Sequence, residues 1–128
     1  MAYYFTKTVA RSFDETLAKL TDELQKEGFG ILTEIDVKET LKKNLSVDFR
    51  RYKILGTCNP PFAYQALQVE DKIGILLPCN VIIQEKGDGQ VEVSAIDPVE
   101  TMKVVGNPKL AALAEQVQEK LKQIVANM

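Results

Sequence analysis

Histidine is absent from this chain of 128 residues, and its absence removes more chemistry than any other feature of the composition. Without an imidazole, the chain forms neither a Ser-His nor a Cys-His nucleophile pair, and no metal site in it contains a histidine ligand. Hydrolases that depend on a histidine-containing triad are therefore excluded.

Motifs of the common cofactor-binding folds are also missing. The chain contains no Gly-x-Gly-x-x-Gly, no P-loop and no Cys-x-x-Cys, so dinucleotide, nucleotide and thioredoxin-like chemistries have no motif to support them. Cys58 and Cys79 are the only cysteines, whereas a structural zinc site takes four Cys or His ligands and a catalytic site three protein ligands. We therefore expect no metal and no cofactor.

Strong charge and long apolar runs are lacking as well. Sixteen basic and eighteen acidic side chains leave a formal net charge of -2, which gives no overall field that would attract nucleic acid or an anionic membrane. No stretch approaches the roughly 18 apolar residues of a membrane span, and the first residues do not form a charged segment followed by an apolar run. Two cysteines are too few for a secreted disulfide framework. We therefore expect a cytoplasmic protein with reduced thiols.

The residues that are present are typical of a globular domain. Hydrophobic side chains at 45% and charged ones at 27% lie close to the globular average, and the length suits one domain, so residues 1–128 are expected to form a single domain. Capping residues or Asn-Pro pairs mark the starts of helices. The four predicted helices begin after Ser12, Asp36, Asn59 and Asn107.

The predicted strands alternate with these helices at first and end in a hairpin. Segments rich in β-branched or aromatic residues lie at 3–9, 29–35, 47–58, 81–86 and 91–96, and Gly87-Asp88-Gly89 joins the last two. The aromatic residues of the first strand, Tyr3, Tyr4 and Phe5, are expected to pack in the core, or else in a dimer interface, rather than to line a pocket. Five strands with long helices near both ends indicate an α+β fold, a single antiparallel sheet with the long helices on one face.

Three ordered segments carry a resemblance to a known family. They are Glu27-Gly28-Phe29-Gly30, the run YKILGTCNP from Tyr52 to Pro60, and the run GILLPCNV from Gly74 to Val81. Their order and separation resemble the signature blocks of the domain of unknown function 302 family. The resemblance implies a TATA-binding-protein-like arrangement of one strand, a helix, four strands and a final helix, and a homodimer. It implies no biochemical activity, and the acidic chain lacks the basic surface that DNA binding would require.

Two related tripeptides, Cys58-Asn59-Pro60 and Pro78-Cys79-Asn80, each stand at a boundary between elements. If they lie close together, Cys58, Asn59, Cys79 and Asn80 form a site in which a thiol faces a cleft. The unpaired N–H groups of a helix that starts at Pro60 would favour an anion or a thiolate there. In the alternative interpretation, both cysteines are small buried side chains and both asparagines are caps.

Basic side chains form a second candidate site. Arg51 and Lys53 lie on the same side of the predicted third strand and are candidates for binding a phosphate or a carboxylate. They belong to a run of cations that also includes Lys42, Lys43 and Arg50. Alternation along the strand places Arg50 on the opposite side, so no single face collects all of these charges, and a solvated surface is the alternative.

Two functions from different classes remain. The first is a homodimeric module that binds a small ligand or a protein partner. The second is a thiol-dependent redox protein or enzyme that uses Cys58, Cys79 or both. A reactive thiol is expected to have a pKa well below about 8.5, whereas a packing cysteine resists reagents until the protein unfolds.

Overall fold

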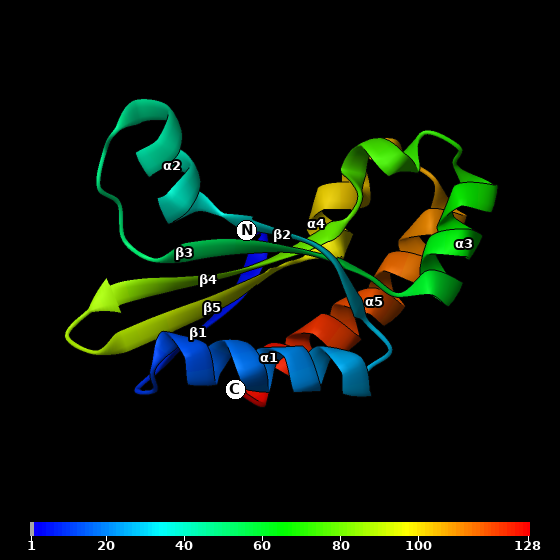
Figure 1. Cartoon of the computed structure of the whole chain (residues 1–128). Helices are drawn as coiled ribbons and strands as arrows, with labels where there is room; N and C mark the ends of the chain where they lie inside the picture. The colour runs from blue at the N-terminus through cyan, green and yellow to red at the C-terminus, as the bar shows by residue number, and fades with distance from the viewer. Residues whose placement is uncertain (1) are drawn as a thin grey trace.

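The computed structural model describes residues 2–128, which form five strands and the helices that connect them (Figure 1). The four predicted helix starts are confirmed: for example, Ser12 Oγ accepts a hydrogen bond from the Glu15 N–H at 3.1 Å, and Asn107 Oδ1 accepts one from the Lys109 N–H at 3.0 Å. In chain order the elements are β1 (Tyr4–Val9), α1 (Phe13–Lys26), β2 (Gly30–Asp36), α2 (Val37–Leu45), β3 (Tyr52–Cys58), α3 (Pro60–Val69), the 3₁₀ helix η1 (Ile73–Leu76), β4 (Cys79–Gly87), β5 (Gln90–Ile96), α4 (Pro98–Met102), the 3₁₀ helix η2 (Lys103–Val105) and α5 (Pro108–Ala126).

All five strands pair antiparallel in one sheet, in the order β1-β5-β4-β3-β2. β4 and β5 form the predicted hairpin, and its turn has positive φ at Gly87, Asp88 and Gly89, which favours the glycines found there. β2 lies at one edge of the sheet. Its pairing with β3 shifts register between Ile31 and Thr33, so β2 bulges near Leu32, beside the end of β3.

The two long helices, α1 and α5, cover one face of the sheet, the lower face in Figure 1. Their apolar stripes bury Leu20 and Leu24 of α1 and Leu121 and Ile124 of α5 against the inward side chains of the strands. The layered arrangement confirms the expected α+β fold, with one antiparallel sheet and the long helices on one face.

A second, smaller core lies at the end of the sheet near α3 and α4. Its buried members are Ala66, Ile73 and Leu110, which come from α3, η1 and α5. The sequence patterns do not predict η1 or α4, because helices this short show no apolar period. Within residues 2–128, no helix has both the length and the apolarity needed to cross a membrane.

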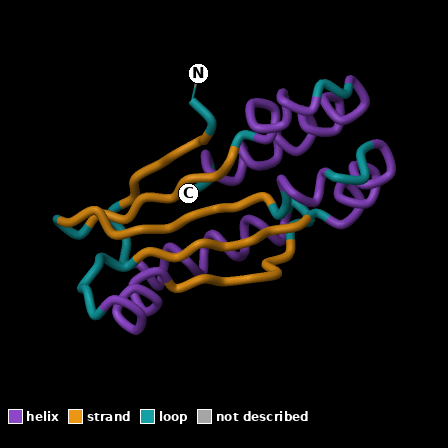
Figure 2. Tube along the Cα trace, turned by 90° about the horizontal axis from the view of Figure 1, so that it is seen from above, coloured by secondary structure: helices purple, strands orange, loops and turns teal. Residues whose placement is uncertain are grey.

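The opposite face of the sheet, which we call the open face, has no long helix on it. Figure 2 looks onto this face and shows the strands uncovered between α2 and the helices at the far end of the sheet. The strand register aligns Ile35, Ile54 and Ile82 in one row across β2, β3 and β4. This row lies on the open face, because the residues that alternate with it, such as Leu55 and Val81, belong to the buried core.

The aromatic residues at the start of β1 divide between the two faces. Phe5 packs against the main core, whereas Tyr3 and Tyr4 are 65% and 42% exposed. The expectation that all three pack in the core is therefore wrong for the two tyrosines. Alternation along the strand accounts for the difference between Phe5 and Tyr4, since neighbouring side chains point to opposite faces.

Candidate functional site

An apolar cavity of about 420 Å³ lies between the main core and the smaller core. Its walls come from β2, β3, the start of β4, α3, α4 and the first half of α5. None of its lining residues is Asp, Glu, Lys or Arg. The cavity is lined by Phe29, Leu32, Thr33, Thr57, Cys58, Asn59, Phe62, Ala63, Ala66, Leu67, Leu77, Pro78, Cys79, Pro98, Met102, Leu110, Leu113, Ala114 and Val117.

Cys58 and Cys79 both line this cavity, from the end of β3 and the start of β4. The two strands pair so that Thr57 stands opposite Cys79, and Cys58 follows that pair by one residue at the end of β3, near enough to affect the pKa of Cys79. The Thr57 hydroxyl supports this register, because it donates a hydrogen bond to the Cys79 carbonyl oxygen at 2.6 Å. The structure therefore brings together two thiols that lie far apart in the sequence.

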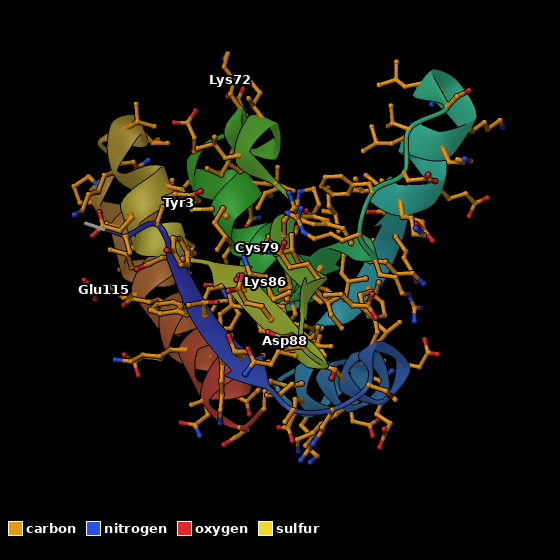
Figure 3. All side chains as sticks on the ribbon, turned by 90° about the vertical axis from the view of Figure 1, so that its left-hand side faces the viewer. Tyr3, Lys72, Cys79, Lys86, Asp88 and Glu115 are labelled. Carbon is orange, nitrogen blue, oxygen red and sulfur yellow. The ribbon has the colours of Figure 1, made fainter. Side chains whose placement is uncertain are left out.

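The surroundings of the two thiols differ. Cys79, labelled in Figure 3, is buried, whereas Cys58 is half-buried. Burial raises the pKa of Cys79 from 9.0 to about 11, and the neighbouring Cys58 adds to the increase. Cys79 is therefore a protonated thiol at neutral pH, and nucleophilic or metal-ligand chemistry requires a thiolate. In the part of the chain that the structure describes, no three His, Cys, Asp or Glu side chains gather as a metal site.

Asn59 precedes α3, but its side chain does not cap that helix. Instead, Asn59 Nδ2 donates a hydrogen bond to the Glu27 carbonyl oxygen at 3.1 Å and so links the start of α3 to the turn between α1 and β2. Gly28 in that turn has a φ of +85°, and a Cβ atom on it would lie 3.2 Å from Asn59 Nδ2. Position 28 therefore favours glycine for two reasons, its left-handed backbone and the approach of Asn59.

Gly56 allows a second close approach, in β3. A Cβ atom on this glycine would lie 2.9 Å from Pro78 Cγ and would overlap the hydroxyl of Thr33. Thr33 belongs to β2, and Pro78 directly precedes β4. Side chains from the two sides of β3 therefore meet over Gly56. We use the term junction for Gly28, Thr33, Gly56, Asn59 and Pro78, the residues that make these two approaches.

The fourth residue of the predicted site, Asn80, does not line the cavity. It is exposed on the open face, where the register pairs it with Gly56. The alternative in which both asparagines are helix caps is wrong for Asn80, which lies within β4, while Asn59 stands at the N-cap position of α3 but bonds Glu27 with its side chain. The structure therefore groups Cys58, Asn59 and Cys79 and leaves Asn80 outside.

The start of α3 does not offer the row of N–H groups on which the predicted anion site depends. The first two residues of the helix are Pro60 and Pro61, which have no backbone N–H. Phe62 is the first residue of α3 that has an N–H to donate. The cavity end of this helix is thus poorly suited to hold an anion or to stabilise a thiolate.

Arg51 and Lys53, the weaker candidates for anion binding, lie away from the cavity. Arg51 Nη2 is 3.0 Å from Asp14 Oδ1, and Lys53 Nζ is 2.6 Å from Glu34 Oε1. Each cation already has a carboxylate partner at the surface, where such pairs exchange readily with solvent. Their arrangement fits the solvated-surface alternative better than a phosphate clamp.

Most of the cavity wall consists of apolar residues that the sequence analysis does not single out. Phe62 and Leu67 of α3, Met102 of α4 and Leu113 of α5 belong to this group. Helical periodicity identifies the apolar side of each helix, but it does not tell whether two such sides close completely against each other. One signal was available: the ten residues of α3 include no charged side chain, which is unusual for a helix at the surface.

The three segments that carry the family resemblance meet at this cavity. The first contributes Phe29, the second contributes residues 57–59, and the third contributes residues 77–79. The same segments supply four of the five residues of the junction. The cavity is thus the place in the fold where the most distinctive parts of the sequence come together.

Comparisons with other proteins agree with the resemblance. One similar solved structure is the crystal structure of an uncharacterised conserved DUF302 protein from Bacillus stearothermophilus, which matches with a TM-score of 0.91 and 26% sequence identity over 98% of each chain. No protein of curated function matches the chain. The sequence profile of the family described as domain of unknown function DUF302 matches residues 5–128. The chain therefore belongs to the DUF302 family.

Proposed function

We propose that this chain is a binding module that holds a small apolar ligand in the cavity. The cavity itself supports the proposal most directly, because about 420 Å³ of space is walled by apolar side chains where the three signature segments meet. This volume lies within the range of roughly 300–1,000 Å³ typical of small-molecule sites, and a mostly apolar lining with a few polar groups is also typical of them.

The walls of the cavity are held in place by contacts within the chain. Asn59 and Glu27 fix the start of α3, and the close packing over Gly56 fixes the segment that leads into β4. A site of this kind needs little ordering when the ligand arrives, so the removal of apolar surface from water drives binding.

We infer a cytoplasmic location from the two unpaired thiols.

Two copies of the chain are further proposed to associate through the open face. The row Ile35, Ile54 and Ile82 has no long helix of the same chain above it. α2 borders this face and is amphipathic, yet none of its residues is buried and Leu45 is 65% exposed. Apolar surface left exposed in this way marks interaction sites, and a two-fold axis would cover it with the same surface of a second copy.

A thiol-dependent function is the second candidate, supported by the convergence of Cys58 and Cys79 on one cavity. A nucleophile or a redox pair depends on a thiolate at neutral pH. The raised pKa of Cys79 acts against that role and leaves Cys58 to act alone. The apolar cavity therefore supports ligand binding better than thiol chemistry.

Filling the cavity is expected to weaken ligand binding while the fold is kept. Ala63 lines the cavity from α3 and is half-buried, so Ala63→Leu puts a larger apolar side chain into the binding space. We expect the wild type to bind the neutral fluorophore N-phenyl-1-naphthylamine and the variant to bind it at least about tenfold more weakly. A fluorescence titration measures both affinities.

The matched control for this experiment is Ala112→Leu. Ala112 is exposed on α5 and does not line the cavity, so its replacement leaves the affinity at the wild-type value. If Ala63→Leu keeps both a native circular dichroism spectrum and wild-type affinity, the fluorophore binds elsewhere and the proposed site is wrong.

A charge on α2 is expected to separate the proposed dimer. Leu45→Glu places a carboxylate in the apolar surface of the interface, while the monomer loses nothing because Leu45 is exposed there. Sedimentation velocity over a range of concentrations is expected to give a dimer for the wild type and a monomer for the variant. Val104→Glu is the control, because Val104 is 82% exposed in η2, outside the open face. A monomeric wild type, or a dimeric Leu45→Glu variant, contradicts this interface.

Alkaline unfolding tests the protonated state of Cys79. Its pKa is raised in the folded chain, so between pH 9.0 and about 11 ionisation of the thiol stabilises only the unfolded chain. The free energy of unfolding of the wild type, relative to Cys79→Ala, is therefore expected to fall by about 1.3 kcal/mol from pH 8 to pH 10. Urea titrations measure this difference, and titrations of other groups cancel in it. A difference that stays constant means that Cys79 ionises normally in the folded protein, which favours the thiol-dependent candidate.

A further inference from the structure

The polar atoms in the wall of the cavity indicate the chemical class of its ligand, an inference that rests on the proposed binding function. We propose that the ligand is a neutral, largely apolar molecule with one hydroxyl or N–H group, which donates a hydrogen bond to Asn59 Oδ1. Two features of the wall lead to this class: an oxygen acceptor without a partner in the chain, and the absence of charge.

The orientation of the Asn59 amide follows from its partner. Glu27 offers a backbone carbonyl oxygen, which only accepts hydrogen bonds, so the atom that faces it at 3.1 Å is the amide nitrogen. The position that a Cβ on Gly28 would occupy is 3.2 Å from Nδ2 and 4.0 Å from Oδ1. The nitrogen thus lies against the turn between α1 and β2, and the oxygen is directed away from it.

Asn59 Oδ1 accepts no hydrogen bond from the described part of the chain. The backbone of α3 does not donate to it, since the helix begins with two prolines. Asn59 is 92% buried. Every fully buried side-chain oxygen or nitrogen in residues 2–128 has a hydrogen-bond partner, so Oδ1, which has none, is itself not fully buried. Because Asn59 lines the cavity, its oxygen is the acceptor that the proposal assigns to the ligand.

The neighbouring polar side chain also presents an acceptor rather than a donor. Thr57 is buried, and its hydroxyl hydrogen is used in the 2.6 Å bond to the Cys79 carbonyl oxygen. Thr33, the other hydroxyl residue of the wall, is exposed. The interior wall therefore matches a ligand that supplies a hydrogen atom, as an alcohol or a phenol does.

The lack of charge excludes ionised ligands from this class. No Asp, Glu, Lys or Arg lines the cavity, and the buried thiol of Cys79 is protonated at neutral pH. A carboxylate or an ammonium group would lose its hydration without gaining an opposite charge. A neutral molecule avoids this cost and keeps the gain from burying its apolar part.

Three ligands of one shape but different polar ends test the proposal: 4-propylphenol, 4-propylanisole and 4-propylbenzoate. Each is titrated into the wild-type protein with bound N-phenyl-1-naphthylamine, and its dissociation constant is obtained from the displacement. We expect the phenol to bind at least about fivefold more tightly than its methyl ether, as befits one hydrogen bond to a buried acceptor. The benzoate is expected to be the weakest of the three.

Asn59→Ala assigns the effect to this residue. Its removal is expected to bring the affinities of the phenol and the ether to within about twofold of each other, and this ratio does not depend on the overall stability of the variant. If the ether or the benzoate binds the wild type as tightly as the phenol does, the proposed ligand class is wrong although the cavity still binds. If none of the three displaces a fluorophore whose binding Ala63→Leu weakens, the ligand class is wrong, whereas a wild type that does not bind the fluorophore contradicts the binding function itself.

Discussion

Gly56 lies where residues from both sides approach β3, and the arrangement of the whole site depends on its missing side chain. Pro78 and Thr33 occupy the space that a Cβ atom at this position would need. Thr33 is held by the pairing of β2 with β3, and Pro78 leads directly into β4. Packing at this density tolerates little added volume, so the glycine sets how closely the three segments come together.

The junction explains why an open cavity survives beside a well-packed core. Pro78 packs over Gly56 of β3, next to Leu77 of the cavity wall, and Asn59 holds the start of α3 against the turn that precedes β2. The wall is therefore anchored on one side by contacts of the Thr33, Asn59 and Pro78 side chains, while α3, α4 and α5 complete it with apolar side chains. The proposed ligand site lies at this end, and the open face with α2 presents a separate surface to a second copy (Figures 1 and 2).

Sequence patterns predicted the parts of this fold that depend on local interactions. Ser12 with Glu15 marks a helix start, and Gly87-Asp88-Gly89 marks a hairpin, because caps and tight turns involve neighbouring residues. The cavity depends on contacts between distant segments, such as the pairing of Thr57 with Cys79 and the bond between Asn59 and Glu27. No local pattern specifies these contacts. The weakness of the predicted anion site, by contrast, was readable from the two prolines that open α3.

The stability of Gly56→Ala, measured by urea unfolding beside Gly30→Ala, tests the role of the junction most directly. Both glycines lie in strands, but a Cβ at Gly30 meets no atom within 4 Å, whereas one at Gly56 meets Pro78 and Thr33. The expected result is a loss of about 1–3 kcal/mol in the free energy of unfolding for Gly56→Ala, as in other overpacked sites. Gly30→Ala is expected to change it by less than about 1 kcal/mol. If both variants are as stable as the wild type, the close approach over Gly56 does not organise the site.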